Sequence, residues 1–478
     1  MKCRTFTAED QAAFAELSGD YNPLHVDAVA ARRLLYRAPV VHELNALMWA
    51  LDAWLEDRGE PLEISSLAGR FFQPIRVGDA VRLALTHQDE SHVGMELFVG
   101  DTVAGETVVG TVEFEWVKAE PKRAEYLEAR FPEKHEPRVL AAAEMEGRGG
   151  TLGLCLNTEA TARLFPQLAR CCTPLEIATL LATTRLVGME CPGLHSLFSE
   201  LRLRAAPTDR ESTLTYVVTE ANQQRGTVVM DIAAPGLTGQ VKASLRPAPA
   251  EQASYAELRA RVKADEFAGQ RALVVGGLRG LGEVVAKLLA AGGSDVKVTY
   301  HLGEQEAHHI VDEIKSCGGS AGCVACNVLS TEQQPLVESL NGWRPTHVYY
   351  FATPYIFSGT NVAFSPPLFH SFCDYYLTGF LNVMNAIPTA EVTKVFHPSS
   401  VVVEEPTADM AEFAVAKSAA EALCAYLESS KQGLFVYRPR LARMATDQTV
   451  AMAPADRQDP APAMIEHLRI FRDTAAAR

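Results

Sequence analysis

An acidic and a basic side chain lie five residues apart near the start of this sequence, at Asp20 and His25. Asn22 and Pro23 stand between them. A residue before proline is pushed out of the helical region, so the segment is predicted to turn. A carboxylate and an imidazole on one turn can each transfer a proton to or from a substrate. The chemistry that needs such a pair is the addition or removal of water.

The loop resembles that of the MaoC-type (R)-specific enoyl-CoA hydratases and dehydratases, which reads Asp-x-Asn-Pro-x-His. His42 follows seventeen residues after His25, at the distance typical of the family, and residues 6–17 ahead of the loop also resemble it. This resemblance implies that Asp20 and His25 are the catalytic pair. The structural alternative is a loop that only turns the chain into the following helix, for which Asp27 is the expected cap.

The same resemblance implies a division of labour. During hydration, Asp20 takes a proton from water at Cβ of the enoyl thioester, and His25 delivers one to Cα on the same face. Backbone N–H groups at the start of the central helix, near His42 and Glu43, stabilise the enolate-like oxygen. The family has glycine where this chain has Glu43, so the added Cβ is expected to narrow the pocket or move the donor. Asn22 is expected to hold the loop or the carboxylate, or only to form the turn.

Composition restricts the classes of protein that fit. A chain of 478 residues, 47% hydrophobic and 22% charged, is an ordinary globular sequence with room for two to four domains. A net charge of -15 argues against a nucleic-acid partner. We expect no signal peptide, no membrane span and, from scattered cysteines, a cytoplasmic location. The CxxC at Cys323 and Cys326 is interpreted as a strand coincidence, and no metal is expected.

Residues 1–120 are predicted to form the catalytic domain. The order of its elements, a loop, a long apolar helix and then strands, is similar to the hotdog fold of the hydratase family. In that fold an antiparallel sheet wraps around a helix. The predicted helix covers residues 40–56, and the predicted strands cover residues 65–74, 79–87, 93–99 and 107–117.

Residues 138–250 are predicted to form a second, non-catalytic hotdog. Residues 65–70 align with residues 195–200 at an offset of 130, which indicates duplication. A helix over residues 174–190 corresponds to the first copy's helix, but the catalytic loop has no counterpart. We expect this copy to complete the acyl groove and to pair its sheet edge with the first copy. The predicted fold class is an α+β double hotdog followed by a second domain of α/β type.

Residues 268–478 are predicted to form that second domain, a Rossmann-like doubly wound parallel sheet, because apolar β-branched runs alternate with helices. Gly276, Gly280 and Gly282 close the first strand and open a helix, where a pyrophosphate binds. Their spacing resembles that of the short-chain dehydrogenase/reductases.

The cofactor predicted for this domain is NADP(H). The second strand ends at residues 299–301 without an acidic residue to bind a ribose 2′-hydroxyl. Arg279, inside the glycine-rich loop, could pair with a 2′-phosphate or could be a solvated residue at the helix start. The dehydratase step needs no cofactor.

The catalytic residues of the reductase-like domain are incomplete. Ser400 and Lys417 match the family's serine and lysine, but Phe413 stands where the resemblance places the proton-donating tyrosine. Tyr376 replaces the structural asparagine. Three interpretations stay open: the domain is a scaffold derived from a reductase, it uses Tyr376 as a substitute acid, or it binds cofactor and regulates.

The predicted function is an (R)-3-hydroxyacyl-thioester dehydratase, equivalently a trans-2-enoyl-thioester hydratase, in fatty-acid or polyketide biosynthesis. Its partner is an acyl-CoA or an acyl carrier protein thioester, since both carriers share the phosphopantetheine arm. A homodimer is also considered. The alternatives are a bifunctional 3-oxoacyl reductase plus dehydratase, and a non-catalytic scaffold that binds acyl thioesters in a multienzyme complex.

Overall fold

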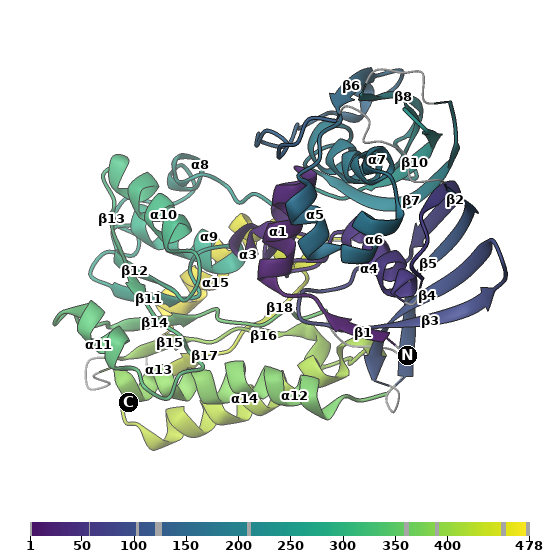
Figure 1. Cartoon of the computed structure of the whole chain (residues 1–478). Helices are drawn as coiled ribbons and strands as arrows, with labels where there is room; N and C mark the ends of the chain where they lie inside the picture. Colours follow the sequence, from purple (N-terminus) through teal and green to yellow (C-terminus); the bar gives the residue numbers. More distant parts are fainter. Residues whose placement is uncertain are drawn as a thin grey trace. The chain divides into compact units, whose positions relative to one another are not determined.

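A computed structural model describes the protein over residues 2–56, 58–101, 105–119, 127–207, 212–357, 363–387, 392–450 and 456–474. The chain divides into two compact units, Met1–Ala248 and Pro249–Arg478 (Figure 1). Within the described ranges, no helix combines the length and the apolar character needed to cross a membrane. Each unit is built around its own sheet.

The first unit contains one ten-stranded sheet in the order β1-β3-β4-β5-β2-β7-β10-β9-β8-β6. Read from either end, the two halves have the same order: first strand, third, fourth, fifth, second. Every pair of neighbouring strands in this sheet is antiparallel. The strands are β1 (Lys2–Thr5), β2 (Leu62–Phe71), β3 (Ala80–Gln88), β4 (His92–Asp101), β5 (Gly105–Lys118), β6 (Gly149–Gly153), β7 (Ser196–Ala205), β8 (Thr213–Asn222), β9 (Thr227–Ala234) and β10 (Leu237–Leu245).

The two halves join where β2 pairs with β7. Ser66 lies opposite Arg204 and Arg70 opposite Glu200, so the ladder continues across the middle of the sheet. Pairing two edge strands in this way removes the exposed N–H and C=O groups that each half would otherwise present.

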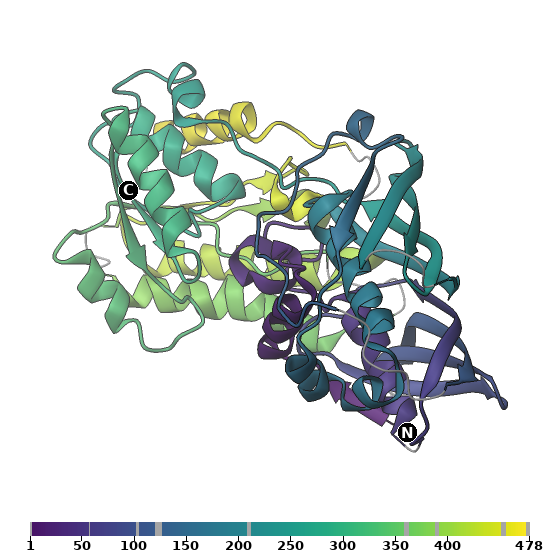
Figure 2. The same cartoon turned by 45° about the horizontal axis from the view of Figure 1, so that its top comes forward.

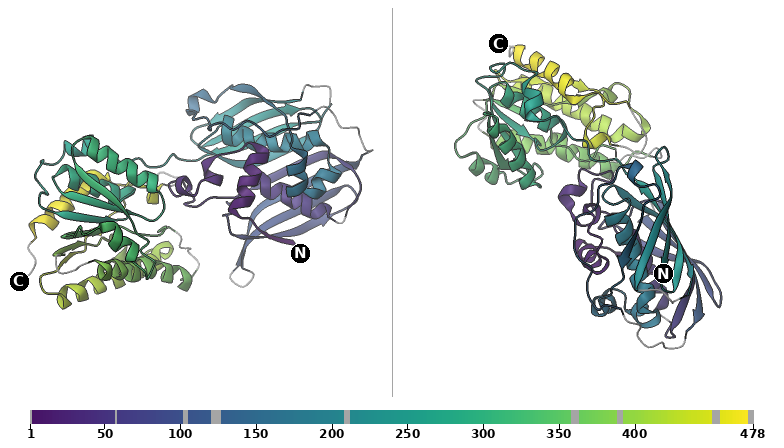
Figure 3. Two further views of the ribbon diagram at one scale, coloured as in Figure 1. Left: turned by 60° about the vertical axis from the view of Figure 1, so that its left-hand side comes forward. Right: turned by 90° about the horizontal axis from the view of Figure 1, so that it is seen from above.

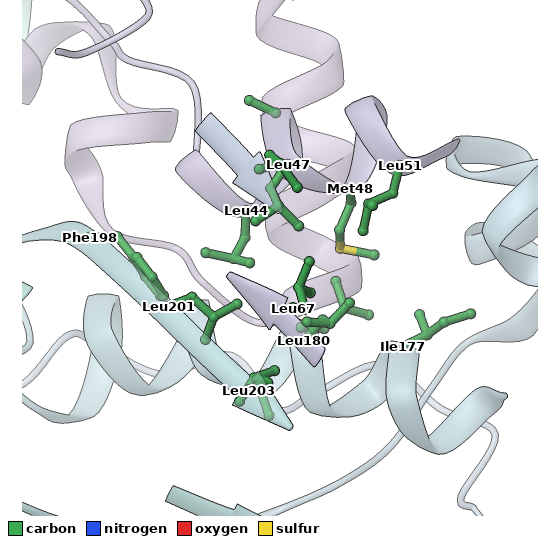
Figure 4. Close-up of a cluster of buried hydrophobic side chains, with 14 of the residues drawn as sticks. Leu44, Leu47, Met48, Leu51, Leu67, Ile177, Leu180, Phe198, Leu201 and Leu203 are labelled. Carbon is green, nitrogen blue, oxygen red and sulfur yellow. The ribbon is translucent and has the colours of Figure 1, made fainter. Parts of the chain in front are cut away.

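The helices of the first unit lie against one face of its sheet (Figure 3). The two most buried are α4 (Glu43–Leu55) and α7 (Pro174–Arg185), one in each half. Leu44, Leu47 and Met48 of α4 meet Leu180 of α7 and Leu201 of β7 in one continuous core (Figure 4). The remaining helices are α1 (Ala8–Ser18), α2 (Pro23–Val26), α3 (Ala28–Ala31), α5 (Thr158–Leu164) and α6 (Pro166–Cys171).

The start of α4 differs from the sequence prediction because of contacts with residues far along the chain. The predicted helix over residues 40–56 begins only at Glu43, with His42 as its N-cap. Val40 forms an isolated bridge with Arg76, and the Val41 N–H donates to the Ile75 carbonyl at 2.8 Å. These extended contacts use the backbone of residues 40 and 41, so the helix starts after them.

The second unit has a six-stranded parallel sheet in the order β13-β12-β11-β14-β15-β17. Counted along the chain this is 3-2-1-4-5-6, the order of the Rossmann fold. The sequence prediction of a doubly wound parallel sheet is therefore confirmed. The strands are β11 (Arg271–Val275), β12 (Asp295–Tyr300), β13 (Ser320–Ala325), β14 (His347–Tyr350), β15 (Lys394–Phe396) and β17 (Phe435–Tyr437).

Helices cover both faces of this sheet (Figures 1 and 2). Alternate residues of β11 belong to different cores: Ala272 and Val274 to one, Leu273 and Val275 to the other. A strand buried on both faces explains the unbroken apolar run in its sequence. The first core receives α9 (Gly280–Ala291), α10 (Glu304–Ser316) and α15 (Pro460–Asp473); the second receives α11 (Gln334–Leu340), α13 (Phe380–Ala386) and α14 (Ala411–Ser430).

Candidate active site

The Asp20–His25 loop is shaped by the end of one helix and the start of another. Helix α1 ends at Gly19, whose φ of 78° is left-handed, a conformation that favours glycine. The Asn22 side-chain oxygen then accepts from the Leu24 N–H at 3.1 Å and caps the short helix α2, with Pro23 in its first turn. Asp20 therefore comes just before the turn at Asn22 and Pro23, and His25 comes just after it.

Asp20 is a buried carboxylate with two hydrogen-bond donors. The residue as a whole is only 2% exposed. The Thr184 hydroxyl donates to one carboxylate oxygen at 2.6 Å, and the Asn22 N–H donates to the other at 3.2 Å. Burial raises the pKa of Asp20 to about 6, although both hydrogen bonds act in the opposite direction. The carboxyl group can therefore gain and lose a proton near neutral pH.

The second half of the first unit holds this loop in place. The Asn22 amide nitrogen donates to the carbonyls of Gly188, at 3.0 Å, and Leu194, at 3.2 Å. A Cβ at Gly188 would lie 2.1 Å from an Asp20 carboxylate oxygen, so glycine is required there. Sequence reasoning missed Thr184 and Gly188. The only signal was a pair of threonines and a glycine within an otherwise apolar helical run, residues 174–190.

His25 is fixed in one tautomer by a backbone carbonyl. Its Nδ1 donates to the Val40 oxygen at 2.9 Å, which leaves Nε2 as the nitrogen with the lone pair. The ring stacks on that of His42, with the centroids 3.9 Å apart. Burial, followed by the positive charge of Arg246, lowers the pKa of His25 to about 4. His25 is therefore a neutral imidazole at neutral pH.

His42 uses both of its ring nitrogens within the protein. Nε2 lies 3.0 Å from the Asp20 carbonyl and Nδ1 lies 2.9 Å from the Gln11 side-chain oxygen. Burial and the neighbouring His25 lower its pKa well below the usual value. These contacts make His42 a residue that positions the loop backbone and the His25 ring.

The fold brings the three predicted groups together. One carboxylate oxygen of Asp20 and one ring nitrogen each of His25 and His42 lie within 4.8 Å of one another. Glu43 begins α4 directly beside them, and burial raises its pKa to about 8. Asp27 lies outside the cluster, because its carboxylate accepts from two backbone N–H groups and caps α3. The prediction that Asp27 is a helix cap is confirmed.

Arg246 is a further buried group that sequence reasoning missed. It follows β10 and is 3% exposed. One guanidinium nitrogen donates to the Leu194 carbonyl, whereas Nε and Nη1 have no hydrogen-bond partner among the described residues. Its charge acts on the pKa values of both His25 and Tyr36, so it lies beside the candidate site. A lone arginine after an apolar strand gave no distinctive sequence signal.

The glycine-rich loop of the second unit is packed so tightly that its glycines are required. Gly276 and Gly280 have left-handed φ values of 78° and 56°. A Cβ at Gly282 would lie 2.2 Å from the Gly276 carbonyl oxygen. Helix α9 starts at Gly280, and its N-cap, Arg279, makes no side-chain cap hydrogen bond. The first N–H groups of α9 thus suit a phosphate of a dinucleotide.

Arg279 and Ser400 both have contacts within the protein. The Arg279 guanidinium lies 3.8 Å from the Asp447 carboxylate, which offsets the charge that was predicted to meet a 2′-phosphate. The Ser400 hydroxyl accepts from the Val402 N–H at 3.4 Å.

Aromatic side chains surround Lys417 in the second unit. Its Nζ donates to the Pro398 carbonyl at 2.8 Å and lies 3.8 Å from the centroid of the Tyr376 ring. Burial lowers the pKa of Lys417 to about 7. The Phe413 ring packs edge-on against Tyr376, with the centroids 5.9 Å apart. The Tyr376 hydroxyl lies 2.6 Å from that of Thr353, and burial raises its pKa.

Comparisons with known proteins find similarity at the N-terminus of the chain. The profile of the MaoC-like domain family matches residues 1–109. The chain is 33% identical over 81 residues to the peroxisomal enoyl-CoA hydratase 2 of Arabidopsis thaliana, covering 16% of this chain and 26% of that protein. It is 37% identical over 81 residues to the (R)-specific enoyl-CoA hydratase of Aeromonas caviae, covering 16% of this chain and 59% of that protein. The chain thus carries an N-terminal MaoC-like domain, and it spans less than two thirds of these relatives.

Solved structures also resemble the chain. One is a dehydrogenase/reductase from Sinorhizobium meliloti 1021, with 18% identity and a TM-score of 0.39, covering 45% of this chain and 91% of that one. Another is the angucycline C-6 ketoreductase LanV with bound NADP, with 17% identity and a TM-score of 0.40, covering 44% and 91%. The Rossmann-like fold of the second unit follows from its strand order.

Proposed function

We propose that the protein is an (R)-3-hydroxyacyl-thioester dehydratase, equivalently a trans-2-enoyl-thioester hydratase. The observation that carries this proposal is that ligand atoms of Asp20 and His25, from one buried loop, and of His42, at the start of α4, lie within 4.8 Å of one another. The MaoC-like match over residues 1–109 and the enoyl-CoA hydratase relatives support the same reaction. The carrier proposed is coenzyme A or an acyl carrier protein.

Two proton-transfer groups serve the reaction. Either direction requires one proton shared by Asp20 and His25, because one group must give a proton while the other accepts one. With pKa values of about 6 and about 4, that proton resides mainly on Asp20. These values favour His25 Nε2 as the acceptor from water and Asp20 as the donor to Cα. This polarity is opposite to the one that the family resemblance implied.

Stabilisation of the thioester oxygen is assigned to the start of α4 and to Arg246. The first N–H groups of α4 follow His42, which makes no side-chain cap bond to them. A helix N-terminus stabilises negative charge, and negative charge develops on the enolate oxygen in the transition state. Arg246 adds a buried positive charge with two nitrogens unbonded among the described residues. A protonated Glu43 carboxyl group carries no negative charge and so would not repel the developing charge on this oxygen.

The second half of the first unit is proposed to be a non-catalytic hotdog copy. Its five strands repeat the order of the first five, which supports a double hotdog. It supplies Thr184, Gly188 and the Leu194 carbonyl as supports of the loop. Its proposed roles are to position Asp20 and to complete the acyl groove.

The second unit is proposed to bind NADP(H) without efficient reduction. The glycines of the β11–α9 loop and the start of α9 would hold the dinucleotide phosphates, and the cofactor would supply hydride chemistry when bound. Phe413 has no proton to give. Lys417 is occupied by the Pro398 carbonyl and the face of Tyr376. A bifunctional reductase remains the second candidate, because the Tyr376 hydroxyl and Thr353 form a hydrogen-bonded pair beside Lys417.

A hydration assay with crotonyl-CoA tests the central proposal. We expect loss of the enoyl-thioester absorbance and accumulation of the (R)-3-hydroxy product, identified by chiral chromatography. The same assay with crotonyl acyl carrier protein identifies the preferred carrier. A folded protein that binds crotonyl-CoA but does not hydrate it above the uncatalysed rate would support the scaffold function instead.

A further inference from the structure

Two histidines and a glutamate meet on the outer face of the first unit's sheet, away from the Asp20–His25 loop. His87 lies near the end of β3, His92 at the start of β4 and Glu113 on β5. Their side chains are 44%, 31% and 48% exposed. No step of the proposed hydratase reaction uses them.

A glycine on β4, the strand between β3 and β5, lets these side chains approach one another. His87 pairs with Gly94 across β3 and β4, and Gly94 pairs with Glu113 across β4 and β5. His92 is two residues before Gly94, so it projects from the same face. A Cβ at Gly94 would lie 2.2 Å from Cε1 of His87. The absence of a side chain at the centre of the row therefore makes room for the His87 ring.

The three groups have the spacing of ligands around one small ion. His92 Nε2 lies 3.2 Å from His87 Nε2 and 2.9 Å from a Glu113 carboxylate oxygen. His87 Nε2 lies 3.3 Å from the same oxygen. Tetrahedral zinc bonds of about 2.0–2.2 Å separate neighbouring ligand atoms by roughly 3.3 Å. The triangle of two nitrogens and one oxygen matches this separation.

Neighbouring residues contact the His87 ring and the His92 backbone, while His92 Nδ1 lies 3.2 Å from His87 Nε2. The Thr86 hydroxyl lies 3.2 Å from His87 Nδ1 and can accept its proton, which leaves the Nε2 lone pair facing the other two groups. The Asp89 carboxylate accepts from the His92 N–H at 2.8 Å and holds the start of β4. A hydrogen-bonded second nitrogen is the usual arrangement for a histidine that binds a metal.

We propose that His87, His92 and Glu113 form a binding site for a divalent transition-metal ion of the Zn²⁺ class. Two imidazoles and one carboxylate favour Zn²⁺ over Mg²⁺ or Ca²⁺, which prefer oxygen ligands. Solvent occupies the remaining coordination position. The ion joins β3, β4 and β5 on their outer face. This site was not foreseen from the sequence, which predicted no metal.

Zinc titration of the chelator-stripped full-length protein tests the site. With a competing chromophoric chelator, we expect stoichiometric binding that His92→Ala and His87→Ala each weaken by at least tenfold. His135→Ala is the matched control, since His135 is an exposed histidine that lies 3.4 Å from a single glutamate, Glu190. Asp20→Asn is the second control, because it disrupts the other His–carboxylate group. Unchanged zinc affinity in both β-strand histidine variants, or loss of binding only in Asp20→Asn, overturns the proposal.

Gly94→Ala provides a test that removes no ligand. The new methyl group displaces the His87 ring, so we expect zinc affinity to fall while crotonyl-CoA hydration and the far-UV circular dichroism stay unchanged. Co²⁺ bound to the wild type should show the visible absorption of a four-coordinate ion, and Gly94→Ala should weaken it. If the wild type binds neither Zn²⁺ nor Co²⁺, the three side chains form only a hydrogen-bonded network, and the proposal is wrong.

Discussion

The Asp20 loop and the Lys417 region differ in what their buried polar groups contact. In the first unit, a carboxylate oxygen of Asp20 lies within 4.8 Å of a ring nitrogen of His25, and their pKa values are about 6 and about 4. In the second unit, Lys417 donates to a backbone carbonyl and lies on the Tyr376 ring, while Phe413 fills the adjacent space. One region keeps a buried acid and a buried base within 4.8 Å of each other. In the other region, the Lys417 ammonium group interacts with the Pro398 carbonyl and the face of the Tyr376 ring.

This difference shows that matching residue spacing does not secure a reaction. Both regions match a family pattern at several positions, and both fold into well-packed elements. Proton transfer additionally requires groups that carry a transferable proton and point at one place.

Removing either member of the first pair should have the largest effect. We expect Asp20→Asn and His25→Ala each to reduce crotonyl-CoA hydration by roughly a hundredfold or more, because each group performs one proton transfer. Steady-state kinetics on purified variants measure this. Asp27→Asn is the matched control, because Asp27 is a carboxylate near the same loop that only caps α3. Retention of more than about a tenth of kcat in either variant would exclude that residue from catalysis.

Restoring a phenol should create activity in the second unit if its site is otherwise intact. We expect wild-type reduction of 3-oxoacyl thioesters by NADPH to be absent or very slow, and Phe413→Tyr to raise it by about a hundredfold. The loss of NADPH absorbance in the near ultraviolet follows the reaction. Rapid reduction by the wild type would contradict the comparison. Its loss in Tyr376→Phe would then identify Tyr376 as the acid.

The hydrogen bond from Thr184 should set the pH dependence of the first site. Since protonated Asp20 is one of the required forms, wild-type kcat/KM for hydration should fall as pH rises through about 6. Thr184→Val removes a donor that lowers the Asp20 pKa, so this limb should move to higher pH by about one unit. Thr183→Val is the control, because Thr183 donates to the Leu180 carbonyl. An unshifted limb in Thr184→Val would show that it reports another group.

The smallest expected effect is on stability. Because burial raises the pKa of Asp20 from 3.8 to about 6, the folded state binds its proton more tightly than the unfolded state. Its contribution to stability is therefore complete below pH 3.8 and is lost as pH rises through about 6. We expect Asp20→Asn to gain about 1–2 kcal/mol relative to wild type between pH 5 and pH 8. Urea unfolding at both pH values measures this difference.

Tryptophan fluorescence can follow that unfolding in the relevant unit. Three of the four tryptophans, Trp49, Trp54 and Trp116, belong to the first unit. The opposite result would be a wild type that becomes more stable than Asp20→Asn at pH 8. It would show that the two hydrogen-bond donors stabilise the Asp20 carboxylate by more than burial destabilises it.

Local sequence patterns predicted the elements well where one physical rule acts alone. The parallel strands of the second unit were found from apolar runs, and Asp27 was recognised as a cap. The helix predicted over residues 40–56 started too early, because the contacts of Val40 and Val41 with Ile75 and Arg76 lie far along the chain. Such contacts leave no local signal. The same holds for Thr184 and Gly188, which support Asp20 from the other half of the first unit.

The sequence by itself determined which chemical groups this protein has and which of them share a turn. Asp20, Asn22 and His25 are close because they are neighbours in the chain, and proline and glycine set the backbone between and before them. Only the tertiary structure decided the protonation of these groups, since burial and distant partners shift each pKa. It also brought His87, His92 and Glu113 within ligand distance, because strand register depends on pairings that a linear pattern does not encode.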